Sequence, residues 1–158
     1  MNVLVIYAHP YKQSFNHAIK ETIVESVALG SNLVEVRDLY VLNFDPVLRA
    51  EELANSFNSG TVLDDVAVEQ EFIRWADMVV FVYPLWWAGM PAILRGYLDR
   101  VLSFGFAYTA DENGTTGLLG NKQIVMINTI GATQQDYEAN GMLKALETIA
   151  NPGIFNFC

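Results

Sequence analysis

The chain has little cysteine and little positive charge, and both shortages limit what it can be. Its 158 residues include one cysteine, Cys158, so an intramolecular disulfide and a metal site built from several thiolates are both impossible. We therefore expect a reducing, cytoplasmic location. Nine Lys and Arg residues stand against 18 Asp and Glu residues, which gives a formal charge of −9. This balance excludes a nucleic-acid binder that works through a clustered basic surface.

Long uninterrupted hydrophobic runs are also missing. The charge-free stretch 78–94 falls just short of a membrane span, and Pro84, Gly89 and Pro91 interrupt it. We interpret it as a strand, a loop and a helix, so we expect no membrane association. The apolar N-terminal run stops at His9, without the basic start and longer apolar core of a secretory signal.

The apolar residues, 52% of the chain, are arranged as expected for an α/β protein. Continuous apolar runs typical of strands covered on both faces lie at residues 3–7, 78–83 and 124–127, with weaker candidates at 33–36 and 154–157. Apolar residues at helical spacing lie within residues 15–27, 63–73, 93–101 and 142–149. The alternation predicts one flavodoxin-like domain over residues 1–158, with a doubly wound five-stranded parallel sheet in the order 2-1-3-4-5.

Two stretches stand out in this scheme. The predicted fifth strand reaches Cys158, so the final helix of such a fold is missing. Because a parallel sheet is normally covered on both faces, we expect either a C-terminally truncated fragment or a second subunit over that face. Residues 42–60 are predicted to be a long surface connection.

Ligands of doubly wound folds bind beyond the carboxyl ends of the strands, which places function in three loops: 9–16, 84–90 and 129–137. The first loop lacks both glycine-rich phosphate motifs, but Ser14 and free backbone N–H groups at a helix N-terminus suit an anion. The alternative is that Ser14 serves only as an N-cap.

The other two loops supply aromatic and small residues. Trp86 and Trp87 directly follow a buried strand, and they suit either a planar ligand or core packing. In the third loop, Gly131 permits close backbone approach, and the phenol of Tyr137 can donate or accept a hydrogen bond. The alternative for Tyr137 is an ordinary surface tyrosine.

Five ordered motifs carry a resemblance to a known family. They are the loop 9–16 with Ser-Phe-Asn, the stretch 84–96 with Pro-Leu-x-Trp-x-Gly-x-Pro-Ala-Ile-Leu-x-Gly, Phe-Ala-Tyr-Thr at 106–109, the loop 129–137, and Phe-x-Phe-Cys at 155–158. Together they resemble the NAD(P)H:quinone oxidoreductase (DT-diaphorase-like) branch of the flavodoxin-like fold, over nearly the whole chain.

The resemblance implies a homodimeric flavoprotein with FAD, or alternatively FMN, and NAD(P)H as co-substrate. The cofactor-binding residues that it implies are His9, Ser14, Phe15 and Asn16 around the flavin phosphate, Pro84, Leu85, Trp86 and Trp87 along the isoalloxazine, and Thr129, Gly131 and Ala132 at its pyrimidine end. The backbone N–H groups of Trp86 and Trp87 are implied near the N5 and O4 edge of the ring.

The resemblance also implies a catalytic residue and a shared pocket. Tyr137 faces the substrate, and Phe106 and Tyr108 line the pocket of the partner subunit. We infer a ping-pong mechanism in which NAD(P)H delivers a hydride to the flavin and leaves, and a quinone or related acceptor then takes it as two electrons at once. No metal is implied.

Two positions depart from the family pattern. Well-studied vertebrate members have a histidine six residues beyond the active-site tyrosine, where this chain has Leu143. A tyrosine–histidine relay is therefore absent, and Tyr137 or water supplies the proton. Trp86 stands where those members have a smaller polar residue, which predicts a tighter and more apolar pocket.

Two other classes of function remain as alternatives. A flavodoxin-type electron carrier fits the acidic charge, which suits a basic partner, although the loop 9–16 is not the Ser/Thr/Gly-rich loop of flavodoxins. A regulatory subunit that resembles the quinone-reductase-like proteins of potassium-efflux systems shares the fold. A receiver domain is set aside because Ala8 and His9 stand where it needs a carboxylate pair.

Overall fold

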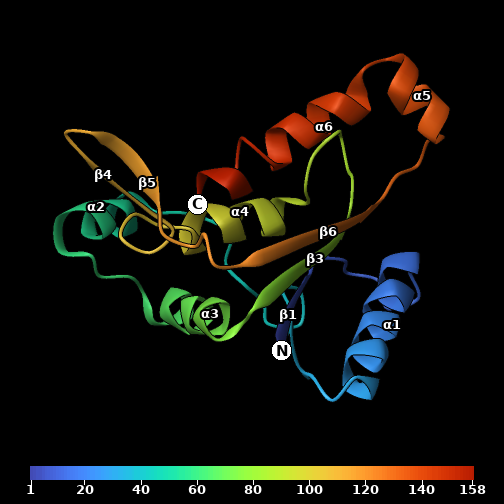
Figure 1. The fold of residues 1–158 in the computed structure, drawn as a ribbon, viewed down its shortest axis with the longest axis horizontal. Helices are drawn as coiled ribbons and strands as arrows, with labels where there is room; N and C mark the ends of the chain where they lie inside the picture. The colour runs from blue at the N-terminus through green and yellow to red at the C-terminus, as the bar shows by residue number, and fades with distance from the viewer.

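A computed structural model describes the backbone of residues 1–158 and the side chains of all of them except Ser59. Its elements, in chain order, are β1 (Asn2–Tyr7), α1 (Phe15–Leu29), β2 (Leu33–Asp38), α2 (Ala50–Ser59), α3 (Asp64–Trp75), β3 (Met78–Pro84), α4 (Ala92–Val101), β4 (Tyr108–Asp111), β5 (Gly114–Gly117), β6 (Gln123–Thr129), α5 (Gln134–Ala139), α6 (Met142–Ala150) and the 3-10 helix η1 (Phe155–Phe157). Figure 1 shows their arrangement in space.

The main sheet is parallel and has four strands in the order β2-β1-β3-β6. β1 and β3 occupy its centre and are almost wholly buried, as their continuous apolar runs predict. The expected α/β fold is therefore confirmed, and the first four predicted strands pair in the predicted order. β4 and β5 form a separate antiparallel hairpin.

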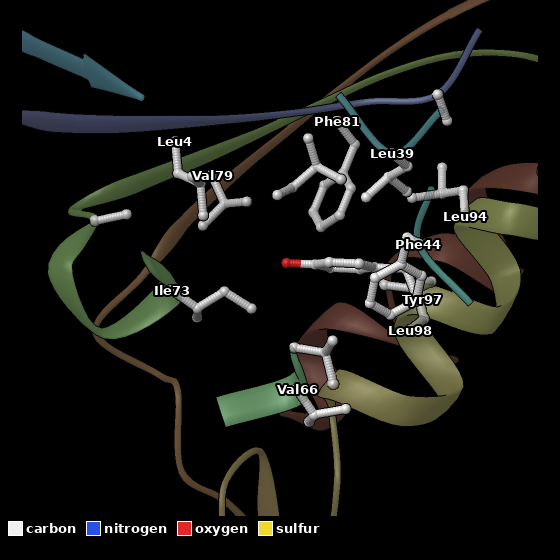
Figure 2. Packing of buried hydrophobic residues seen from close by; sticks show 14 of the residues in the cluster. Leu4, Leu39, Phe44, Val66, Ile73, Val79, Phe81, Leu94, Tyr97 and Leu98 are labelled. Atoms are coloured by element: carbon white, nitrogen blue, oxygen red, sulfur yellow. The ribbon is translucent and has the colours of Figure 1, made fainter. Parts of the chain in front are cut away.

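Alternate residues of the central strands pack against different helices. α1 covers the face that carries Val3, Val5 and Val82. The opposite face carries Leu4 and Phe81 and packs against α3 and α4. Figure 2 shows the ring of Tyr97 from α4 lying among residues of both strands and of α3. Its hydroxyl donates to Glu69 Oε2 over 3.3 Å, which satisfies the one polar atom of this buried side chain.

One prediction about this fold is wrong, that of a fifth strand. Residues 154–157 form no strand: after Pro152-Gly153 the backbone turns tightly, Asn156 N donates to Asn151 O over 2.8 Å, and the Phe155 ring packs against Phe81 with centroids 5.1 Å apart. The predicted surface connection 42–60 contains helix α2, which the sequence analysis did not identify.

A buried ion network fixes α4, the helix that follows the second loop. Arg100, 2% exposed, donates from Nε to Glu52 Oε1 over 2.8 Å and from Nη1 to Asp65 Oδ2 over 2.7 Å. A further bond of 2.8 Å runs from Nη1 to the carbonyl of Asp45. One side chain thus joins α4 to α2, to α3 and to the loop that precedes α2.

The stretch 78–94 has the predicted form, since it comprises β3, a turn and the start of α4. Within the part of the chain that the structure describes, no helix is long and apolar enough to cross a membrane.

Candidate active site

The three predicted loops meet at the carboxyl edge of the sheet. Leu85 N donates to the Thr129 carbonyl over 2.8 Å, which joins the second loop to the third. Asn16 Nδ2 donates to Thr129 Oγ1, also over 2.8 Å, and so joins the first loop to the third. The rings of His9 and Trp86 lie 5.7 Å apart between the first loop and the second. The strand order therefore gathers residues distant in sequence into one site.

The first loop leads into the N-terminus of α1. Ser14 is the N-cap, and its Oγ accepts a hydrogen bond of 3.1 Å from His17 N. Phe15 and Asn16 are the first two residues of the helix, so their backbone N–H groups have no acceptor in the helix's own ladder. The phenyl ring of Phe15 is 73% exposed. The loop thus offers N–H donors and an apolar surface side by side.

Asn16 carries an unsatisfied buried oxygen. The side chain is 3% exposed, and Oδ1 has no hydrogen-bond partner among the described residues. Leaving such an acceptor unpaired costs about 1–3 kcal/mol. Folded proteins rarely retain this cost without a reason, so Asn16 Oδ1 marks a place where a ligand donor fits.

The second loop is a strained hairpin. Trp86 and Gly89 exchange two backbone hydrogen bonds of 3.0 and 3.1 Å, and the two residues between them have positive φ, 53° for Trp87 and 59° for Ala88. Glycine and asparagine are the usual residues in this turn, and a side chain in the left-handed region costs about 1–2 kcal/mol. The structure therefore holds an unfavourable backbone conformation at the centre of the site.

The exposure of the two tryptophans in this hairpin counts against core packing, and their contact with a planar ligand stays a prediction. Trp86 is 42% exposed and Trp87 is fully exposed, so neither serves core packing. The resemblance had implied that both backbone N–H groups face the flavin. The N–H of Trp86 donates to the Gly89 carbonyl, so the N–H of Trp87 is the better placed of the two to bind a ligand, and the role of both stays a prediction. Pro84 is buried at the end of β3.

The third loop places Tyr137 on a capped helix. Thr133 and Asp136 form a reciprocal capping box that starts α5, and Tyr137 follows at once. Its side chain is half-buried and lines a pocket of about 480 Å³ together with Leu85 and Leu143. This position favours a role toward a ligand over an ordinary surface tyrosine, and that role stays a prediction. Gly131 and Ala132 are exposed at the start of the same loop.

The pocket is lined by residues of α4, of α6 and of the sheet. In Figure 1, α6 and α1 lie on opposite sides of the sheet. Two strand residues that sequence reasoning missed, Tyr83 and Asn128, give its sheet wall polar groups. Burial raises the pKa of the Tyr83 phenol, and a hydrogen bond with Asn128 opposes the rise. Their signal in the sequence is two polar side chains near the ends of apolar strands, at positions that parallel pairing places opposite each other.

Phe106 and Tyr108 lie apart from the three loops. Phe106 is 7% exposed and lies in the hydrophobic core of its own chain, with the Arg74 guanidinium 4.8 Å from its ring centre. Tyr108 is half-buried between the rings of Phe104 and Phe157, with centroids 5.8 and 5.2 Å away. Their role toward a partner subunit stays a prediction, and Tyr108 has the more accessible ring.

The parallel sheet and the ligand-ready loops at its carboxyl edge define a flavodoxin-like protein. The sequence model of the family described as having a flavodoxin-like fold matches residues 1–158, and the chain belongs to that family. A Haemophilus influenzae protein named an uncharacterized NAD(P)H oxidoreductase is 46% identical over 159 residues, which cover all of this chain and 78% of that protein.

Two quinone-reducing proteins are also similar. The NAD(P)H dehydrogenase [quinone] 1 of Cavia porcellus is 33% identical over 98% of this chain and 63% of its own length. The chain therefore spans less than two thirds of that relative. The solved structure of an NAD(P)H:quinone oxidoreductase from Methanothermobacter marburgensis matches with a TM-score of 0.86 and 33% identity, covering 94% of this chain and 76% of that one. These findings confirm the resemblance that the five motifs carry.

Proposed function

We propose that the protein is a flavin-dependent oxidoreductase that transfers two electrons, as a hydride, from NAD(P)H to a quinone or related acceptor in a ping-pong cycle. The names of the relatives support the reaction class. The chemistry of the three loops supports the cofactor.

The observation that carries the proposal is the pair of complementary groups at the start of α1. The N–H groups of Phe15 and Asn16 lie at the positive end of the helix dipole and suit a phosphate. The unpaired Asn16 Oδ1, an acceptor, suits a hydroxyl. A flavin nucleotide offers both, since it bears a phosphate on a polyhydroxylated chain. Ser14 caps the helix and adds its hydroxyl beside them, with His9 nearby.

The second and third loops would hold the ring. Leu85, Trp86 and Trp87 present apolar surface and the N–H of Trp87, next to Thr129 at the end of β6. The adjoining small residues, Gly131 and Ala132, leave room for the pyrimidine end. When bound, the flavin supplies hydride acceptance from NAD(P)H and hydride donation to the acceptor. We assign FAD as the nucleotide, with FMN as the alternative.

The chain's own residues bind the acceptor and supply its proton. Tyr137 lines the pocket beside Leu85, where its phenol can donate a hydrogen bond to an acceptor oxygen that gains negative charge. Leu143 lines the same pocket and cannot relay a proton. The proton therefore comes from Tyr137 itself or from water.

The second subunit belongs to the proposal. We assign a homodimer in which Tyr108, and with less accessible surface Phe106, lines the pocket of the partner. The half-buried ring of Tyr108 and the exposed Phe57 and Phe157 nearby support an apolar contact on that side of the molecule.

The test is an absorbance spectrum of the purified protein after loading with FAD or FMN, followed by anaerobic addition of NADH or NADPH and then of a quinone. We expect a visible flavin band that bleaches with the nicotinamide and returns with the quinone. Protein that takes up neither flavin would contradict the proposal and favour a regulatory role. Protein that bleaches only with a protein reductant would favour the electron carrier.

A further inference from the structure

The pocket beside the three loops contains a hydrogen-bond donor that the protein itself uses poorly. The Tyr83 side chain is 2% exposed, and the acceptor that its hydroxyl reaches is the thioether sulfur of Met126, 3.9 Å away. Sulfur is a weak acceptor, so this contact recovers little of the free energy that burying a hydroxyl costs. A ligand oxygen would serve the phenol better.

Asn128 arranges the phenol for that role. Tyr83 and Asn128 are directly paired in the register of β3 and β6, so their side chains leave the same face of the sheet next to each other. A hydrogen bond between the two side chains opposes the rise that burial causes in the pKa of Tyr83, so the amide lies within reach of the phenol. The phenol proton, which points to the weak acceptor sulfur of Met126, can turn to a better acceptor.

The rest of the pocket indicates what kind of molecule fits. Apolar side chains dominate the lining, and they come from the second loop, from β6 and from α6: Leu85, Met90, Met126, Ile130, Leu143 and Leu146. A volume of about 480 Å³ lies within the usual range for small-molecule sites. Burial raises the pKa of Tyr83, so the phenol keeps its proton at neutral pH and acts as a neutral donor. Arg95 and Glu147 place one charge of each sign in the lining, so the pocket favours neither ionic sign. The complementary ligand is an apolar ring without net charge that carries a carbonyl oxygen.

We propose that Tyr83 donates a hydrogen bond to a carbonyl oxygen of the acceptor, and that this bond makes the pocket selective for carbonyl-bearing rings over hydrocarbons of the same size. The inference rests on the proposed function, because it names a binding group for the acceptor of that reaction. It assigns no proton transfer to Tyr83. Tyr137 and Leu85 line the same pocket, so the bound ring stays in contact with the loops that the reaction uses.

The test compares two ligands that share a carbon skeleton, menadione with two carbonyls and 2-methylnaphthalene with none. Equilibrium dialysis against the flavin-loaded protein, without NAD(P)H, measures affinity and needs no turnover. Tyr83→Phe removes the hydroxyl and keeps the ring, so the fold should persist. We expect the variant to bind menadione about two- to tenfold more weakly, the range for one hydrogen bond, and to bind 2-methylnaphthalene as before.

The matched control is Tyr40→Phe, since Tyr40 lies in the turn after β2, outside the lining of this pocket. It should change neither affinity. Equal weakening of both ligands by Tyr83→Phe, or no weakening of either, would overturn the inference. In turnover, Tyr83→Phe should raise KM for menadione while the rate of flavin bleaching by NAD(P)H stays unchanged. Failure to bleach in the wild-type protein would count against the proposed function alone, because the dialysis result stands without it.

Discussion

At the scale of single residues, the site depends on polar groups that have structural partners on one side only. Ser14 Oγ accepts from His17 N, and Asn16 Nδ2 donates to Thr129, yet Asn16 Oδ1 is left over. Buried polar atoms without a partner are few in folded proteins, and each one asks for an explanation such as a bound ligand. The same argument applies to Tyr83, whose buried hydroxyl donates to a weak acceptor, the sulfur of Met126.

Ser14 allows its capping role to be separated from ligand binding. Ser14→Ala removes the cap and should cost about 1 kcal/mol of the free energy of unfolding, together with some affinity for flavin. Ser14→Asp keeps a capping oxygen but adds a negative charge where we place the phosphate. We expect its thermal stability to match the wild type while its flavin affinity falls further than that of Ser14→Ala. Thermal denaturation and flavin titration measure both. Wild-type flavin affinity in Ser14→Asp would place the phosphate elsewhere.

Tyr137 should act in one half of the reaction. Because its side chain lines the acceptor pocket, Tyr137→Phe should slow reoxidation by a quinone more than reduction by NAD(P)H. Stopped-flow absorbance separates the two halves, with Tyr40→Phe as the control. An equal loss in both halves would mean that Tyr137 positions the ring rather than serving the acceptor.

At the scale of elements, the hairpin of the second loop joins strain to exposed aromatic surface. Replacing Trp87-Ala88 by Asn-Gly supplies residues that accept positive φ, so we expect the protein to gain about 1–3 kcal/mol of stability and to lose flavin affinity. Ala88→Gly is the matched control, since it relieves part of the strain and keeps Trp87. Denaturant unfolding and flavin titration on both variants check this. A double variant that keeps full flavin affinity would remove Trp87 from the cofactor site.

The buried network around Arg100 makes a prediction about stability. Arg100→Met leaves the Glu52 carboxylate, whose residue is 6% exposed, without its partner and should cost about 3–5 kcal/mol. Adding Glu52→Met should recover part of that loss, because the unpaired buried charge disappears. Urea denaturation of the single and double variants measures the difference. If the double variant is no more stable than the single one, the cost does not come from the stranded charge.

The same network gives a pH dependence. The hydrogen bond from Arg100, with help from its charge, holds the pKa of Asp65 below its ordinary value of 3.8. A carboxyl whose folded-state pKa is depressed adds stability above its unfolded pKa and loses it as pH falls through the folded one. The stability difference between the wild type and Asp65→Asn should thus be constant above about pH 5 and shrink below pH 3.8. A difference that does not change with pH would contradict this assignment.

The sequence was informative about elements where pattern and packing agree. Continuous apolar runs identified β1, β3 and β6, and their order followed from the handedness of parallel crossovers. The prediction of a strand at residues 154–157 was wrong because a short aromatic run after Pro-Gly can form either a strand or a tight turn, and its pattern does not distinguish the two. Helix α2 was missed because most of its residues are polar. The residues that it buries include the polar Glu52 and Ser56.

The site could be predicted to the level of loops but not of atoms. Spacing and strand order predicted that residues 9–16, 84–90 and 129–137 would meet, and they do. The left-handed backbone at Trp87 was hidden, since nothing in the sequence marks a tryptophan for positive φ. The Tyr83–Asn128 pair was hidden as well, because it depends on the register of two strands that are far apart in the chain.

At the scale of the whole molecule, net charge sets how two copies meet. Each chain carries −9, so the proposed homodimer would assemble against a repulsion that salt screens. We therefore expect the dimer dissociation constant to fall when NaCl rises from about 0.02 to 0.5 M, where the Debye length shrinks severalfold. Sedimentation equilibrium measures this dissociation constant.

Tyr108→Glu, which puts a further negative charge on the proposed contact, should weaken the dimer and steepen the salt dependence. Tyr108→Phe keeps the ring and should leave both unchanged. A monomer at every salt concentration would contradict the homodimer. If Tyr108→Glu leaves the dimer dissociation constant unchanged, the two subunits meet through another face.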